Sequence, residues 1–189
     1  MYSNVRGLKS KKASLTEILH EHDPQVFLIT ETQLRSNTGT TIQGYTFYSK
    51  IREHGLGGGV GIFVKNDIRN NTATHTTHRQ IEILWISIKR KNFPPLFIGT
   101  YYGKQETRTS KDEIEKEMTL LQEEITEMKR DGEIYLAMDA NAKIGLLNEP
   151  ISRNGKLRLN VLKSTDLIIM NKSEKCIGSI TRQNTKKRV

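Results

Sequence analysis

The chain has 189 residues, of which 35% are hydrophobic and 27% are charged, and it carries a net charge of +9 with a pI near 9.6. This composition is typical of one globular domain with a lean core, and no apolar run reaches membrane-spanning length. The single cysteine, Cys176, excludes an internal disulfide framework and fits a reducing compartment. No signal peptide is visible, so we expect an intracellular protein of the cytoplasm or nucleus. The positive charge favours a polyanionic partner, nucleic acid first and an acidic membrane second.

Apolar runs and periodicities predict alternating strands and helices along the chain. In the first half we expect strands at 1–5, 25–30, 45–49 and 59–64 and a helix at 11–22. In the second half we expect strands at 81–88, 96–102, 133–139 and 167–170 and helices at 110–129 and 157–163. Segments 35–44 and 66–79 are expected as polar loops, and a turn is expected at Pro94-Pro95. A strand–helix–strand unit at each end of this order indicates an α/β fold.

The stretch 133–145, EIYLAMDANAKIG, is the most informative for function. Its apolar first half predicts a buried strand, which ends at Asp139 and Asn141. In an open α/β sheet, ligands lie outside the carboxyl ends of the strands. A carboxylate beside a carboxamide can orient water, a metal or a phosphate, although an Asx turn that closes the strand explains the same residues.

Other expected strands also end in polar side chains. Asn4 ends the first strand, Glu31 follows the second, and Tyr101-Tyr102 end the strand at 96–102. Carboxylates gathered with amides and a tyrosine at one sheet edge of a basic protein suggest Mg²⁺ chemistry on phosphate. Mg²⁺ prefers one or two carboxylates, several waters and phosphate oxygens.

Five short words in this sequence together resemble the endonuclease/exonuclease/phosphatase superfamily, and more closely the apurinic-type endonuclease domain of LINE-type non-LTR retrotransposons. They cover nearly the whole chain in the family's order, and each is weak alone. The words are SNVRGL at 3–8, FLITET at 27–32, GGVGIF at 58–63, TYY at 100–102 and MDAN at 138–141.

The resemblance implies a four-layered α/β sandwich, two mixed sheets face to face with helices outside, and an active site at the sandwich edge. By the same resemblance, Asn4 and Glu31 match the family's metal site, and Tyr101 best matches its phosphate-contacting tyrosine, with Tyr102 as the alternative. Asp139 matches the residue that activates or orients water, and Asn141 matches the asparagine beside it. The DNA-facing residues that the resemblance implies are Arg6, Thr181 and Arg182.

The chemistry implied is Mg²⁺-dependent nicking of DNA, with Mn²⁺ as a substitute, in an element that also encodes a reverse transcriptase. The family's pattern continues with a further Asp and a final Asp-His pair, and the sequence contains neither. The resemblance therefore implies one domain, 1–189, that is incomplete at its C-terminus and lacks the last strands. Two alternatives stay open: a catalytically inactive, transposon-derived module that binds nucleic acid or protein, and a phosphoesterase acting on lipid or inositol phosphates.

Overall fold

The computed structural model describes residues 1–52, 57–69, 72–75, 80–145 and 149–170. The first half contains β1 (Tyr2–Asn4), α1 (Leu8–His22), β2 (Val26–Thr30), β3 (Tyr45–Lys50), β4 (Val60–Lys65) and β5 (Thr72–His75). The second half contains β6 (Glu82–Arg90), β7 (Phe93–Tyr102), the 3-10 turn η2 (Glu106–Arg108), α2 (Lys111–Asp131), β8 (Glu133–Asp139) and α3 (Arg153–Ser164). Among the described residues, no helix is long and apolar enough to cross a bilayer.

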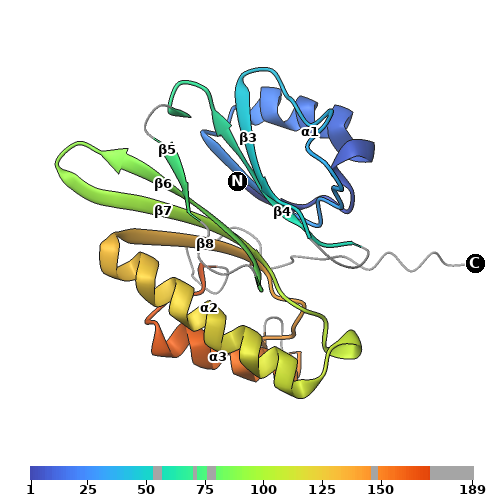
Figure 1. Cartoon of the computed structure of the whole chain (residues 1–189), viewed down its shortest axis with the longest axis vertical. Helices are drawn as coiled ribbons and strands as arrows, with labels where there is room; N and C mark the ends of the chain where they lie inside the picture. The colour runs from blue at the N-terminus through green and yellow to red at the C-terminus, as the bar shows by residue number, and fades with distance from the viewer. Residues whose placement is uncertain (53–56, 70–71, 76–79, 146–148, 171–189) are drawn as a thin grey trace, which may run out of the picture.

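The strands form two mixed sheets, which confirms the fold class predicted from the sequence. One sheet has the order β1-β2-β4-β3 and the other has the order β5-β6-β7-β8. Helix α1 lies on the outer side of the first sheet, and α2 and α3 lie together on the outer side of the second (Figure 1). Each sheet contains one parallel pair, β1 with β2 and β7 with β8. A helix connects the strands of each pair, as parallel strands require.

Three apolar clusters fill the spaces between these four layers. One joins α1 to the first sheet through residues such as Leu15, Leu19 and Phe27. The second lies between the sheets and includes Leu28, Ile62 and Ile86. The third joins the second sheet to α2 and α3. A strand that serves two clusters, such as β6, is therefore apolar on both faces.

Helix α2 begins as its sequence predicts. The Ser110 side chain accepts a hydrogen bond from the backbone N–H of Glu113, and the Glu113 side chain accepts one from the backbone N–H of Ser110. This reciprocal capping box satisfies two backbone donors at the helix start. The apolar stripe of α2, including Ile114, Leu121 and Ile125, is buried against the second sheet.

Three expectations about the elements are wrong. Segment 66–79, expected as a loop, contributes the edge strand β5, which pairs with β6. Pro94 and Pro95 lie inside β7, and the chain turns at Lys91-Asn92, where Asn92 has a φ of 63°. Residues 167–170 do not form a strand. They follow the end of α3, where the Leu167 backbone N–H donates to Leu162 O at 2.8 Å, and Ile168 is 82% exposed.

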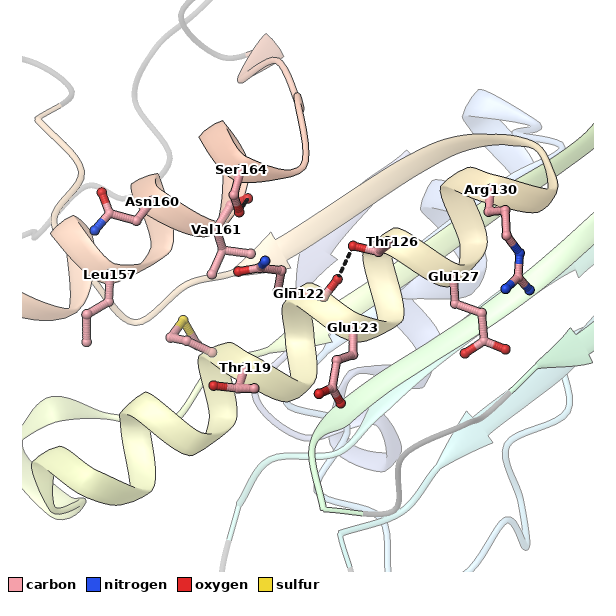
Figure 2. A pocket seen from close by; sticks show the side chains of 11 residues that line it. Thr119, Gln122, Glu123, Thr126, Glu127, Arg130, Leu157, Asn160, Val161 and Ser164 are labelled. Carbon is pink, nitrogen blue, oxygen red and sulfur yellow. Dashed lines mark hydrogen bonds between the residues drawn. The ribbon is translucent and has the colours of Figure 1, made fainter.

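A shallow groove separates α2 from α3 on the face turned away from the second sheet. Polar and charged side chains of α2, such as Gln122 and Glu123, form one wall, and Leu157, Asn160 and Val161 of α3 form the other (Figure 2). None of the predicted site residues that the structure describes lies in this groove.

Candidate active site

The two parallel strand pairs bring four carboxyl ends to one edge of the sandwich. Asn4 ends β1 and Glu31 follows β2 in one sheet, while Tyr102 ends β7 and Asp139 ends β8 in the other. The register pairs Asn4 with Thr30 and Tyr102 with Asp139, so each parallel pair ends level. The apolar runs of β2 and β7 are buried before their ends, whereas β1 is short and β8, expected as a buried strand, is only half-buried, with Tyr135 61% exposed.

Asn4 joins the two sheets through its carboxamide. Its Nδ2 donates to Glu31 Oε1 at 2.8 Å and to Asp139 Oδ2 at 2.5 Å, across 135 residues of sequence in the second case. The Asn4 Oδ1 accepts from the backbone N–H of Arg6 at 3.2 Å, which fixes the orientation of the carboxamide. The Asn4, Glu31 and Asp139 side chains are half-buried, so the carboxylate oxygens remain within reach of solvent.

Asn141 is oriented by the ends of β7 and β8. Its backbone N–H donates to Asp139 Oδ1 at 3.2 Å, so the Asx turn considered from the sequence is present. Its side-chain Nδ2 donates to Gly103 O at 2.8 Å, and Gly103 N in turn donates to Asp139 O at 2.9 Å. The turn and a functional role are compatible, because the turn aims the carboxamide across the edge of the sheet.

The resemblance offers two tyrosines as the phosphate contact, Tyr101 first and Tyr102 as the alternative, and the structure places them on opposite faces of β7. Tyr101 is fully buried on the α2 side of β7, whereas Tyr102 faces the space between the sheets. Burial raises the pKa of Tyr102, and the carboxylates of Glu31 and Asp139 raise it further, while a hydrogen bond with Asn141 lowers it. These interactions associate Tyr102, and not Tyr101, with Glu31, Asp139 and Asn141.

Left-handed backbone conformations concentrate at this edge. Four residues other than glycine with positive φ surround the cluster: Arg6 at 45°, Glu31 at 54°, Gln33 at 51° and Asn141 at 44°. Such conformations are costly for residues with a Cβ and persist where the surrounding structure enforces them. Here the enforcing contacts include Val5 N to Thr30 O at 3.0 Å and Thr32 N to Gly59 O at 3.1 Å.

A charged pair beside Tyr102 is not among the residues predicted from the sequence. The Arg52 guanidinium lies over the Tyr102 ring, 5.5 Å from its centroid, and Arg52 Nε donates to Glu82 Oε1 at 2.5 Å. Glu82 Oε2 accepts from the backbone N–H of Gly59 at 2.5 Å. The sequence signal is weak, because Glu82 is a charged residue at the start of β6, directly before an apolar run; only the register shows that its backbone pairs with Tyr102.

The donor set suits a hard divalent cation. Glu31 and Asp139 present two half-buried carboxylates side by side, and Mg²⁺ typically takes one or two carboxylates while it keeps several waters. In this arrangement Asn4 directs its NH₂ group at both carboxylates, and its oxygen faces Arg6. Within the described residues there is no cluster of three or more His, Cys, Asp or Glu side chains that could hold a metal.

Of the remaining predicted residues, the structure describes Arg6. Arg6 is exposed, and its backbone N–H donates to Asn4 Oδ1, so its backbone borders the cluster. Thr181 and Arg182, expected in a DNA-facing loop, lie outside the described residues, as does Cys176.

Comparison with known proteins identifies the family. Residues 1–130 match the Endonuclease/Exonuclease/phosphatase family, so this chain belongs to it. No curated protein matches the chain.

Solved structures show the same fold at low sequence identity. The AP endonuclease LMAP from Leishmania major is similar with a TM-score of 0.70 and 13% identity, over 87% of this chain and 65% of that one. The endonuclease domain of TRAS1, a telomere-specific non-LTR retrotransposon, has a TM-score of 0.60 and 14% identity, over 87% of this chain and 70% of that one. The 3′ phosphatase NExo from Neisseria, bound to a product DNA hairpin, has a TM-score of 0.65 and 16% identity, over 86% of this chain and 69% of that one. The chain thus spans about two thirds of the length of each.

Proposed function

We propose that this chain is a divalent-metal-dependent endonuclease domain that nicks DNA by hydrolysing one phosphodiester bond. The observation that carries the proposal is the bridge from the Asn4 carboxamide to the Glu31 and Asp139 carboxylates, which gathers two acidic groups from two sheets at one edge. Membership of the Endonuclease/Exonuclease/phosphatase family supports this reaction class.

In this proposal, the carboxylates of Asp139 and Glu31 have different roles, Asp139 in the attack of water and Glu31 in the neutralisation of charge. Asp139 orients a water molecule and accepts its proton as the water oxygen bonds to phosphorus and the bond to the leaving sugar oxygen breaks. Glu31 is the principal ligand of Mg²⁺, or of Mn²⁺ as a substitute. The chemistry that a cation supplies at such a site is neutralisation of charge developing on the phosphate and the leaving oxygen. Asn4 keeps the two carboxylates at a fixed separation.

Asn141 and Tyr102 are proposed to hold the scissile phosphate. Both present polar hydrogens in fixed positions, Asn141 because Gly103 orients its carboxamide and Tyr102 because its ring is buried. Donors fixed before reaction stabilise a transition state without reorganising. The raised pKa of Tyr102 suits a residue that must remain a hydrogen-bond donor.

DNA is proposed as the substrate on the basis of charge and family. The net charge of +9 supplies sequence-independent, salt-dependent affinity for a phosphate backbone. Arg6 at the site edge, with Thr181 and Arg182, is proposed to contact that backbone. The neighbours include a retrotransposon endonuclease domain and a DNA-bound phosphatase, which supports a proposed origin in a LINE-type element with a reverse transcriptase as partner domain.

A plasmid-nicking assay tests the proposal. Supercoiled DNA is incubated with the wild-type chain in Mg²⁺ and in EDTA, and with Asp139→Ala and Asp67→Ala in Mg²⁺. Asp67 is an exposed turn residue that follows β4 at the end of the first sheet opposite to Glu31, so it is the matched control. We expect nicking by the wild type and Asp67→Ala in Mg²⁺ only, and none by Asp139→Ala.

Two other outcomes would contradict the proposal. Salt-sensitive DNA binding by a folded chain that never nicks would identify an inactive nucleic-acid-binding module. Release of phosphate from an inositol phosphate, without DNA binding, would identify a phosphoesterase on the same fold.

A further inference from the structure

Behind the candidate site, on the helix side of the second sheet, two charged side chains are buried. Glu117 of α2 is 2% exposed and Arg158 of α3 is 1% exposed. Burial raises the pKa of Glu117, and the nearby Arg158 charge opposes that rise. Burying a carboxyl group and a guanidinium is costly, so a fold that retains both must use them in specific contacts.

Both side chains bind the peptide groups of one residue, Lys104. The Lys104 backbone N–H donates to Glu117 Oε1 at 3.2 Å and to Oε2 at 3.3 Å. Arg158 Nη2 donates to the Lys104 carbonyl oxygen at 3.3 Å, and its Nη1 donates to Asn154 O at 3.5 Å. The donor and the acceptor of Lys104 are therefore held from two different helices.

Lys104 follows Tyr102-Gly103, the segment that orients the candidate site. Gly103 O accepts from the Asn141 carboxamide, and Gly103 N donates to Asp139 O. The Arg158 guanidinium packs directly against Gly103, because a Cβ at that position would clash with Arg158 Nη2 and lie 3.0 Å from Ala140 O. The contact chain thus runs from Glu117 and Arg158 through Lys104 and Gly103 to Asn141.

We propose that Glu117 and Arg158 are positioning residues, which clamp the Gly103-Lys104 segment and thereby set the placement of Asn141 and Tyr102 for phosphodiester cleavage. This inference rests on the proposed function. Neither residue touches the cluster of Asn4, Glu31 and Asp139, so the pair acts through the backbone. Supporting partners of this kind typically change activity about 10- to 100-fold when they are replaced.

The first test replaces the carboxyl group with an amide of nearly the same shape. We expect Glu117→Gln to slow single-turnover cleavage about 10- to 100-fold while DNA affinity stays within about twofold. Glu124→Gln is the matched control, because Glu124 is equally buried on the same helix but two turns away, about 10 Å further along the axis. Equal rates for the two variants would overturn the proposal.

A second variant approaches the clamp from the strand side. Gly103→Ala is expected to displace Arg158 and slow cleavage. The φ of Gly103 lies outside the left-handed region, so the backbone accepts a side chain, and the nearest atoms that the added methyl group would meet belong to Arg158 and Ala140. This variant keeps every charged group, so it remains informative if Glu117→Gln does not fold.

A double-mutant cycle separates positioning from general loss of stability. If Glu117 acts through Asn141, then Glu117→Gln should slow the Asn141→Ala enzyme by no more than about twofold. If Glu117→Gln slows the Asn141→Ala enzyme as strongly as it slows the wild type, then Glu117 does not act through Asn141, and the proposal is overturned.

An NMR measurement tests whether Glu117 and Arg158 hold the Gly103-Lys104 segment, even if the wild type does not nick DNA. The side-chain amide signals of Asn141 report the hydrogen bond to Gly103. They should shift in Glu117→Gln and Gly103→Ala and stay in place in Glu124→Gln. Unmoved signals in the first two variants would overturn the clamp, whereas a wild type that does not nick DNA would overturn the proposed function alone.

Discussion

Replacing Asn4 with alanine removes the only side chain in the described residues that hydrogen-bonds to both Glu31 and Asp139. A hydrogen bond to a charged group contributes about 1.5–3 kcal/mol net when it is shielded from water. The three side chains are half-buried, so solvent replaces part of each lost bond, and the two carboxylates also face each other without their shared donor. We therefore expect Asn4→Ala to lower the free energy of unfolding by about 2 kcal/mol.

Thermal unfolding followed by circular dichroism in EDTA measures this loss. For a chain of this length, about 2 kcal/mol corresponds to a fall in Tm of about 4–8 °C. Ser3→Ala is the control, because Ser3 lies in the same strand and its hydroxyl makes only a 3.5 Å contact to Asn4 O. A Tm for Asn4→Ala within about 1 °C of Ser3→Ala would refute the role of the Asn4 bridge.

Three further predictions follow from single contacts. Tyr102→Phe should slow cleavage at least about tenfold, and more than Tyr101→Phe does, because only Tyr102 faces the site, whereas the Tyr101 hydroxyl lies beside Glu117 and Arg158; equal rates would refute that assignment. Burial raises the pKa of Glu117 above its ordinary value of 4.5, so its contribution to stability is complete below that value and is lost as pH rises through the folded pKa. Urea titrations from about pH 4 to about pH 8 should show a smaller loss in Glu117→Gln than in the wild type, and parallel profiles would contradict this. Ser110→Ala should cost about 1 kcal/mol in the same titrations at neutral pH, because it removes the cap of α2, and an unchanged midpoint would show that the cap is dispensable.

The strand ends at Glu31 and Asp139 were predictable because each lies where an apolar run gives way to polar residues. Asn4 has a weaker signal, because it ends a short strand with no apolar run. The sequence could not decide between Tyr101 and Tyr102. Both faces of β7 are packed and apolar, so no alternation of polar and apolar residues shows which face meets the site.

Other features depend on tertiary contacts that leave little trace in sequence. Glu117 and Arg158 read as ordinary charged helix residues, because nothing local indicates that α2 and α3 bury them against Lys104. Residues 167–170 have the composition of a strand, yet the backbone bond from Leu167 to Leu162 closes the end of α3 instead. Strand β5 is polar because it lies at a sheet edge, which resembles a loop in composition.

The most direct test of the central claim is a Mg²⁺ titration of the rate at which a DNA duplex is cleaved, with the wild type and Glu31→Gln. If the acidic pair at the strand ends binds the catalytic cation, the wild-type rate should saturate with Mg²⁺. Glu31→Gln should then need at least about tenfold more Mg²⁺ to reach half of its own maximal rate. Superimposable titration curves for the two proteins would contradict the account, because they would place the catalytic metal somewhere other than Glu31.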